Sequence, residues 1–384
     1  MQICSNPRTA PIALALGAML TCAACLSAAP LRAAQDPQPP PDTLSMALEW
    51  LAQHQEPDGH WDSVKNGAAK NDRCDTAATG LAVLAFLSAG ITDRRGEYKD
   101  NVKRALEWII KQQNTEGGIM PGANGKEAGM DAETTHAICG MALAECFGMS
   151  HAPTVKEAAQ KAIEYSAHVL QHGKGVDLTG WGGDKKSPGE TEITVWFVAH
   201  LKCARLAGLA VPQESFQGAI VFLDQMELKD NPKDPTGGHH YKNSNADTQS
   251  APLPTVSGCW ARMLMGWPTD ELRPAITWAV DKKGLPAWGD KGEKFDWTYF
   301  YMGMRLASNC SGTLWERWNS VRSQLLVSHQ CQTGDAKGSW DTSAGAGDRG
   351  QVVSTAFGVL CLEVSHYVPL YGPSQADSTP SKTP

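Results

Sequence analysis

The 384-residue sequence lacks the short motifs of several common enzyme classes. It contains no Gly-x-x-x-x-Gly-Lys-Ser/Thr phosphate-binding loop, no His-Glu-x-x-His zinc motif and no Gly-Cys-Gly-Glu-Gln thioester sequence. It also has no excess of positive charge, because 34 Lys and Arg stand against 41 Asp and Glu. The net charge of -7 argues against nucleic acid as a partner. The charged fraction of 20% and the apolar fraction of 42% are those of an ordinary globular protein.

The N-terminal segment has an apolar run, but the run is short for a bilayer span. Arg8 precedes apolar residues 12–26, and small residues follow over 27–34. This pattern predicts a signal peptide over residues 1–34 and a secreted or periplasmic mature protein. Residues 35–43 read as a Pro-rich linker, and residues 373–384 form a Ser/Thr/Pro tail with too little apolar surface to fold.

Eight cysteines remain after export, which is too few for a disulfide scaffold of this length. Cys203, Cys259 and Cys361 lie in apolar helical runs and are predicted to be buried thiols. Cys310 and Cys331 flank a loop and a helix, and they are the pair that we expect to be bridged.

A motif recurs about every 57 residues from residue 44 to residue 372. Each copy has a helix with an aromatic anchor, a Gly/Trp turn, and a second helix that opens with an acid and a Thr. The anchors are Trp50, Trp108, Tyr165, Phe222 and Trp278, with a degenerate sixth copy near Leu325. Since two helices cannot bury their own apolar face, the copies must pack on one another. We therefore predict an all-α fold, an α/α toroid of about six helical hairpins.

Acidic residues gather where the second helices begin. Aligned on Thr76, Thr135 and Thr194, the place four residues earlier holds Asp72, Asp131 and Glu190, and the place two earlier holds Cys74, Glu133 and Glu192. Carboxylates at these places would cap the helices. The inner helices of a closed ring run parallel, so the same acids would also gather at one mouth and raise one another's pKa.

Aromatic side chains follow the acids along the second helices. They are Trp196, Phe197, Trp260, Trp297, Tyr299, Phe300, Tyr301 and Phe357. They form either a packed aromatic core or the lining of a cavity for an apolar chain. We expect a central apolar cavity near Asp131, Glu190, Trp196, Trp260, Trp297, Tyr299 and Phe357.

Two sequence elements resemble a known family. Leu-Ala-Gln-His-Gln at 51–55 followed by Gly-His-Trp at 59–61, and Gln330 followed by Gly-Ser-Trp at 338–340, are similar to the Gln–Trp repeats of squalene-hopene and oxidosqualene cyclases. Asp-Arg-Cys-Asp-Thr-Ala at 72–77 resembles their acid motif. The resemblance covers residues 44 to 370 and implies the α/α toroid of the terpenoid cyclase and protein prenyltransferase superfamily.

The resemblance implies acid-initiated cyclisation, with Asp72 and Asp75 in the acid motif. However, the place of the proton donor in that motif holds Cys74, and a thiol is a far weaker acid than a carboxylic acid. Glu133 or Glu192 would have to replace it as the catalytic acid. The chain also has length for only one toroid, whereas triterpene cyclases have two.

The prenyltransferases offer a second match, at a zinc site. Asp72, Cys74 and His136 have the residue types of their metal ligands, and Cys74 and His136 are 62 residues apart. The family's own site lies in later repeats and its enzymes need a partner subunit. We therefore expect no metal or other cofactor, with zinc at these three residues as the alternative.

The leading functional prediction is a secreted, squalene/terpene-cyclase-like toroid that binds an isoprenoid or another apolar chain in its centre. The alternatives are a zinc-dependent prenyltransferase-like enzyme, a non-catalytic lipid-binding or interaction module, and a carbohydrate-binding toroid with Trp stacking platforms. The fold alone does not choose among them. Whether the protein is an enzyme, whether it contacts a membrane surface and how many copies associate all stay open at this point.

Overall fold

The computed structural model describes residues 41–121, 127–183, 185–228, 239–289, 295–310, 312–340 and 349–364. The chain divides into two compact units, residues 1–36 and 37–384, and every described residue belongs to the second unit. The predicted signal peptide, most of the predicted linker and the predicted tail lie outside the described residues. Among the described helices, none is long and apolar enough to cross a membrane.

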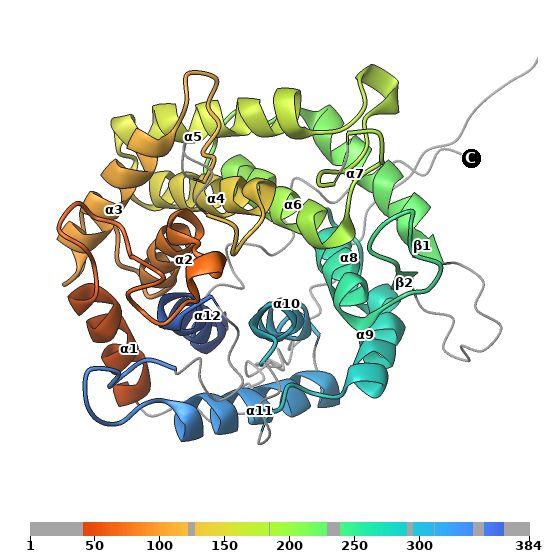
Figure 1. Cartoon of the computed structure of the whole chain (residues 1–384). Coiled ribbons are helices and arrows are strands. Elements are labelled where there is room, and N and C mark those ends of the chain that lie inside the picture. Colours follow the sequence, from red (N-terminus) through yellow and green to blue (C-terminus); the bar gives the residue numbers. More distant parts are fainter. Residues whose placement is uncertain are drawn as a thin grey trace, which may run out of the picture. The chain divides into compact units, whose positions relative to one another are not determined.

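Within the second unit, helices form two concentric rings (Figure 1). The outer helices are α1 (Pro41–Gln53), α3 (Lys99–Gln112), α5 (Pro153–Tyr165), α7 (Gln213–Met226), α9 (Thr269–Lys283) and α11 (Thr313–His329). The inner helices are α2 (Asp75–Ser88), α4 (Ala132–Ser150), α6 (Thr191–Leu206), α8 (Pro252–Leu264), α10 (Trp297–Ala307) and α12 (Gln351–Leu362). Each inner helix packs on the next, and α12 packs on α2. The predicted all-α toroid of six hairpins is confirmed.

Short elements fill the connections between the helices. They are η1 (Lys70–Asp72), the π-helical turn η2 (Ser166–Leu170), η3 (Gly175–Asp177), and the antiparallel strands β1 (Glu227–Leu228) and β2 (His240–Tyr241). The helix α1 begins at Pro41, inside the predicted linker, because proline suits the first turn of a helix and Asp42 complements the helix dipole there.

The two rings differ in burial as their sequences predict. Every residue of α2 is buried, in agreement with an apolar sequence on all sides. In α3 only one face is buried, formed by Val102, Ala105, Leu106 and Ile109. The inner ring is therefore the core, and the outer ring separates it from solvent.

A glutamine after the outer helix joins each of four repeats to its neighbour. The Nε2 group of Gln55 donates to Gly59 O and Asn101 O, and that of Gln113 donates to Gly117 O and Ala158 O. Gln171 and Gln330 make the same double contact, and Gln330 bonds Gly338 O and Thr43 O, both at 2.8 Å. We call this contact the glutamine clamp. The Gln330 clamp joins the last repeat to the first and so closes the ring.

The turns that follow the clamps press against the next outer helix. At Gly338, where φ is +97°, a Cβ atom would lie 2.2 Å from Met46 O in α1. Gly117, with φ of +101°, meets Lys161 O in α5 in the same way. Only glycine permits both this backbone conformation and this approach. These turns are the Gly elements of the sequence repeat.

The aromatic anchors contact the turn of the preceding repeat. His60 stacks on Trp108 with ring centroids 5.2 Å apart, and His240 stacks on Trp278 at 4.0 Å. At the closing seam, the Trp50 indole donates to Asp335 O at 2.9 Å. The anchors therefore hold the interfaces between repeats.

The structure changes the predicted alignment of the inner-helix threonines. Backbone N–H groups of the turns donate to Thr79 in α2, Thr194 in α6, Thr255 in α8 and Thr355 in α12. In α4 the same place is taken by His136, whose Nδ1 accepts from Ile119 N. Thr76 and Thr135 are therefore out of register with Thr194, because the lengths of the turns differ between repeats. The acid of α2 that corresponds to Glu190 is consequently Asp75, not Asp72.

The predicted Cys310–Cys331 disulfide is wrong, because all eight cysteines of the described residues are free thiols. The 17 residues of α11 lie between these two cysteines. A helix of that length spans roughly 25 Å, whereas the Cα atoms of a disulfide lie about 6 Å apart.

The Gln330 clamp generates a stability prediction. Gln330→Ala leaves the carbonyls of Thr43 and Gly338 without this donor, and we expect the free energy of unfolding to fall by about 2–4 kcal/mol. Chemical denaturation would measure it, with exposed Gln324→Ala on the same outer helix as the matched control. Equal effects of the two substitutions would contradict a special role for the clamp.

Candidate functional site

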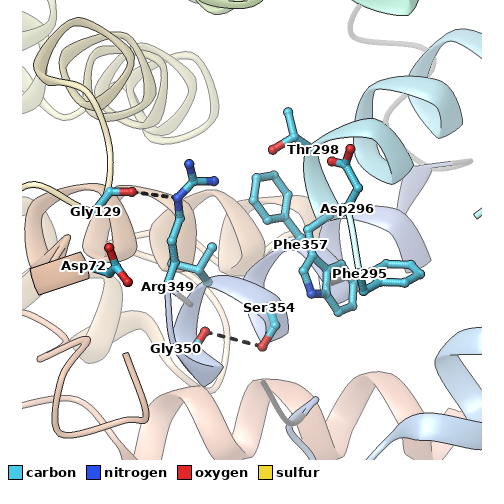
Figure 2. Close-up of a pocket in the computed structure, with 11 residues that line it drawn as sticks. Asp72, Gly129, Phe295, Asp296, Thr298, Arg349, Gly350, Ser354 and Phe357 are labelled. Carbon is cyan, nitrogen blue, oxygen red and sulfur yellow. Dashed lines mark hydrogen bonds between the residues drawn. The ribbon is translucent and has the colours of Figure 1, made fainter. Parts of the chain in front are cut away.

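A cavity opens at one mouth of the ring, where inner helices begin. It has a volume of about 370 Å³. Its walls come from the N-terminal flanks and first turns of α2, α10 and α12 and from the loop before α4. The lining residues are Asp72, Gly129, Phe295, Asp296, Trp297, Thr298, Arg349, Gly350, Val353, Ser354 and Phe357 (Figure 2).

The charged groups of the cavity stand on two sides of Phe357. In Figure 2, Asp72 and Arg349 lie on one side and Asp296 lies on the other. Arg349 Nε donates to Gly129 O at 2.7 Å, which fixes the base of the guanidinium. Its terminal nitrogens make no bond to another described residue. The cavity therefore offers hydrogen-bond donors and acceptors on facing walls.

Asp296 is fixed by the helix that it begins. Its Oδ1 accepts from Tyr299 N at 2.9 Å, so it caps α10, and its Oδ2 forms an ion pair with Lys283 of α9. The sequence predicts capping for acids at this place, and Asp296 shows that capping and exposure to a cavity are compatible.

Trp297 carries a polar atom that the protein does not satisfy. The side chain is only 6% exposed, and its Nε1 atom has no hydrogen-bond partner among the described residues. Phe295 holds the indole with ring centroids 4.8 Å apart. A buried donor without a partner costs free energy, so a ligand acceptor in the cavity would stabilise this arrangement.

Two further carboxyl groups, of Glu133 and Glu192, do not line the cavity but interact with other charged groups at the helix starts. Burial raises the pKa of Glu192 to about 7, and the negative charges of Asp296 and Glu190 act in the same direction. Burial also raises the pKa of Glu133, with smaller contributions from Asp131 and Glu190. The predicted gathering of acids at one mouth thus brings a cavity carboxylate, Asp296, into electrostatic contact with a carboxyl group whose pKa is close to neutral.

The predicted aromatic cavity at the ring centre is wrong, because the centre is packed. Trp196 stacks on Tyr301 with centroids 5.8 Å apart, and Trp260 meets both rings edge-on. Phe357 fills the space beside them, and Trp196 and Trp260 are 4% and 1% exposed. These side chains pack on one another and leave no room for a ligand between them. Of the predicted cavity aromatics, Trp297 and Phe357 line the mouth cavity.

Tyr299, Asp131 and Glu190 also lie outside the cavity lining. Tyr299 is buried beside Trp318, and its hydroxyl donates to Gly284 O at 3.3 Å. Glu190 accepts from Asn243 Nδ2 at 3.3 Å. Asp131 caps α4 by accepting from Thr134 N at 2.6 Å. These three contacts are structural.

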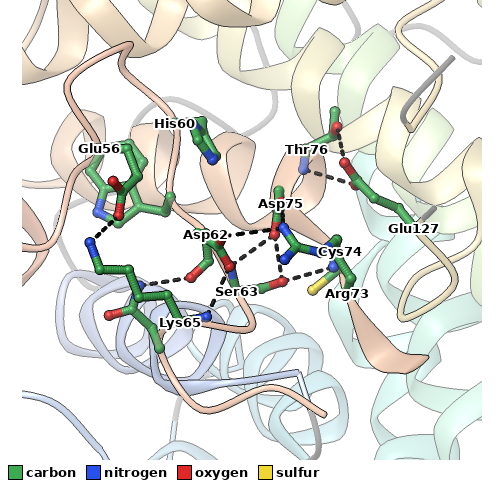
Figure 3. A network of polar contacts seen from close by, with 12 residues as sticks. Glu56, His60, Asp62, Ser63, Lys65, Arg73, Cys74, Asp75, Thr76 and Glu127 are labelled. Atoms are coloured by element: carbon green, nitrogen blue, oxygen red, sulfur yellow. Dashed lines mark hydrogen bonds and ion pairs between the residues drawn. The ribbon is translucent and has the colours of Figure 1, made fainter. Parts of the chain in front are cut away.

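Asp75, a predicted catalytic residue, is held in a polar network at the start of α2 (Figure 3). Its Oδ1 accepts from Ser63 N at 2.8 Å and from Ser63 Oγ at 2.7 Å, and Arg73 pairs with Oδ2. Glu127 adds a second cap, because both Thr76 N and Thr76 Oγ1 donate to it at 3.0 Å. The network orients α2 and leaves Asp72, rather than Asp75, at the cavity.

The candidate zinc ligands Asp72, Cys74 and His136 are not brought together. His136 is fully buried, and its ring nitrogens contact Ile119 N, Ala162 O and Ser166 Oγ. Burial lowers the pKa of His136 to about 4 and raises that of Cys74 to about 12. His136 is therefore a hydrogen-bonded core histidine and Cys74 a packed thiol.

One other group has metal-ligating side chains close together in the described part of the chain. Atoms of His60, Asp62 and Asp75 lie within 4.8 Å of one another. Arg73 contacts both carboxylates, so a guanidinium already supplies the positive charge there.

The sequence patterns did not indicate most of the cavity lining, including Phe295, Asp296 and Arg349, nor Glu127 in the network at the start of α2. Arg349 and Gly350 directly precede the sixth inner helix, as Asp296 precedes the fifth, so reading the residues before each inner helix would have found the arginine. Glu127 gives no comparable signal, because it lies 51 residues from its partner Thr76.

Several solved structures share this fold. A family 76 α-1,6-mannanase of Salegentibacter sp., in complex with α-1,6-mannotriose, is 12% identical with a TM-score of 0.55 and covers 84% of this chain and 98% of its own. An α-amylase from Clostridium perfringens is 12% identical with a TM-score of 0.57, covering 84% and 97%. The cellobiose 2-epimerase of Spirochaeta thermophila is 12% identical with a TM-score of 0.55, covering 85% and 94%. At these identities the similarity shows the fold alone.

No protein-family model matches the sequence, and no curated protein matches it. The predictions of a terpene-cyclase-like function and of an isoprenoid or other apolar partner are wrong. The solved structures named above act on saccharides, and the mannanase holds a mannotriose rather than an apolar chain. The packed aromatic centre gives the physical reason, since it leaves no apolar space for such a chain.

The raised pKa of Glu192 predicts a pH-dependent stability. A carboxyl group with a pKa of about 7 in the folded protein and 4.5 as its ordinary value stabilises the fold fully below pH 4.5. This contribution is lost as the pH rises through 7. We therefore compare the free energy of unfolding of Glu192→Gln with that of the wild type. This difference should shift in favour of the variant by on the order of 2–3 kcal/mol between pH 4.5 and a pH above 8.

Denaturation curves at several pH values would measure this gain. The control is Glu107→Gln, an exposed acid on α3, which should leave the pH dependence unchanged. A parallel pH dependence of Glu192→Gln and the wild type would show that Glu192 is not perturbed.

Proposed function

We propose that this chain is a carbohydrate-active protein that binds a saccharide in the mouth cavity and acts on a glycosidic bond there. The observation that carries the proposal is the composition of the cavity. Asp72 and Asp296 offer acceptors, Arg349 offers donors, and Trp297 and Phe357 offer apolar ring surface. Saccharides have hydroxyl groups at their edges and apolar C–H faces, so they suit such a mixed lining.

Glu192 is the proposed general acid. Hydrolysis of a glycosidic bond uses two carboxyl groups, one protonated and one ionised, that flank the bond. Glu192 has a pKa of about 7, and the nearby Asp296 raises it, so the two groups differ in the way that this chemistry needs. Lys283 pairs with Asp296 and supplies a positive charge beside it. The similar solved structures support the substrate class, and the proposal takes no finer specificity from them.

The proposal includes export. The pattern over residues 1–34 is that of a signal peptide, and an exported protein would meet oligosaccharides outside the cytoplasm.

The test of the reaction is Glu192→Gln assayed on neutral gluco- and manno-oligosaccharides by the release of reducing ends. The variant keeps the size of the side chain but cannot donate the proton, so we expect turnover to fall by roughly 10²–10⁴-fold. Wild-type turnover should decline as the pH rises through about 7, where Glu192 loses its proton. Exposed Glu107→Gln is the control and should retain activity. Full activity of Glu192→Gln would remove it as the acid.

The test of binding is Asp296→Asn, because asparagine also caps a helix while it removes the charge. Calorimetric titration with the same oligosaccharides should show weaker binding with an unchanged fold, whereas exposed Asp270→Asn should bind as the wild type does. Binding without turnover in the wild type would indicate a saccharide-binding module. Absence of binding to any oligosaccharide would overturn the proposal.

A further inference from the structure

A second cavity lies between the connection from α5 to α6 and the start of α7. Its volume is about 700 Å³, and it shares no lining residue with the mouth cavity. Its walls are the end of η2, the loop that contains η3, and the first turn of α7. The proposed reaction at the mouth uses none of these residues.

Three side chains in its walls carry buried polar atoms that have no hydrogen-bond partner among the described residues. They are Gln171 Oε1, His172 Nε2 and Ser215 Oγ, on side chains of residues that are at most 5% exposed. Gln171 and His172 adjoin in the chain, and Gln171 Nε2 lies 2.9 Å from Ser215 O, so the three residues form one group. Each unpaired buried atom costs about 1–3 kcal/mol, which a ligand could remove.

The surrounding bonds decide which roles these atoms play. Gln171 Nε2 donates to Thr179 O and to Ser215 O, so its amide cannot be turned and Oε1 must be an acceptor. His172 Nδ1 lies 2.7 Å from Ser187 O and must carry a hydrogen, which makes Nε2 an acceptor in the neutral ring. The Ser215 hydroxyl can accept or donate. A ligand must therefore supply hydrogen-bond donors.

The backbone beside this group contains an irregular helical turn, which forms part of the cavity wall. The clamp residue Gln171 lies six positions after the anchor Tyr165, whereas Gln55 and Gln113 lie five positions after Trp50 and Trp108. The π-helical turn η2 accommodates the additional residue. Lys185, which also lines the cavity, donates to Leu170 O at 3.3 Å and to Val169 O, two backbone carbonyls of this turn.

The charges on the walls do not favour an ion. Lys174 and Lys185 are balanced by Asp177 and Glu214. A neutral ligand that presents several hydroxyl groups fits both the balanced charge and the two fixed acceptors.

We infer that this cavity is a second binding site, for a neutral polyhydroxylated ligand such as a single sugar unit. Gln171 Oε1 and His172 Nε2 accept hydrogen bonds from its hydroxyl groups, and Ser215 makes the third contact. The inference stands independently of the reaction proposed at the mouth.

The experiment uses methyl α-mannopyranoside and methyl α-glucopyranoside as probes, with binding followed by ligand-observed NMR. Ser215→Ala should weaken binding by roughly three- to tenfold, as expected for the loss of one hydrogen bond. Ser187→Ala is the matched control, because Ser187 Oγ is also buried and unpartnered but does not line this cavity. Thermal unfolding of both variants would establish that each is folded.

Asp296→Asn separates this site from the mouth. It should leave the effect of Ser215→Ala unchanged, even if the proposed reaction at the mouth proves wrong. Equal binding by Ser215→Ala and the wild type would overturn the second site. So would a crystal structure grown with the sugar in which only water contacts the three atoms.

Discussion

The fold depends on a double hydrogen bond from a glutamine amide that joins one repeat to the next. Each clamp donates both amide hydrogens, one to the turn of its own repeat and one to the following outer helix. The contact works only because a glycine lets the turn approach the helix backbone. Gln330 repeats it across 287 residues and, with the Trp50–Asp335 bond across 285, turns a row of hairpins into a ring. Closure is what brings the start of α12 beside the start of α2 and thereby forms the mouth cavity.

Two repeats lack the clamp, and one of them borders the candidate site. Five residues after their anchors, the fourth and fifth repeats carry Glu227 and Lys283 in place of glutamine. Glu227 forms ion pairs with His239 and Arg262, and Lys283 pairs with Asp296 at the cavity. In the fifth repeat, the clamp position is thus occupied by a lysine that pairs with a carboxylate of the cavity lining.

The same physical rule explains why acids serve two purposes in this protein. A carboxylate at the start of a helix satisfies free N–H groups, and parallel inner helices place their starts at one end of the ring. Asp131 and Asp75 accept such structural hydrogen bonds and do not line the cavity. Asp296 caps α10 and still lines the cavity, while partial burial and neighbouring negative charges raise the pKa of Glu192 to about 7. Asp131 and Asp296 hold the same N-cap position and make the same capping bond, so what distinguishes them is that side chains of other elements form a cavity beside Asp296.

The sequence by itself determined the architecture, because a 57-residue spacing of anchors and turns has no other simple solution than packed hairpins. It also indicated that acids gather at one mouth and named Glu133 and Glu192 together as candidate acids, since helix openings are local features. It could not show that Trp196, Trp260 and Tyr301 fill the centre, because an aromatic side chain reads the same whether it packs on another ring or on a ligand. Nor could it set the register of Thr79, His136 and Thr194, which depends on the unequal lengths of the turns. Arg349 and Glu127 reached their places only through ring closure and loop folding, which bring together residues far apart in the chain. The spacing of repeated residues can be read from the sequence, whereas the residues that line a cavity depend on contacts between distant parts of the chain.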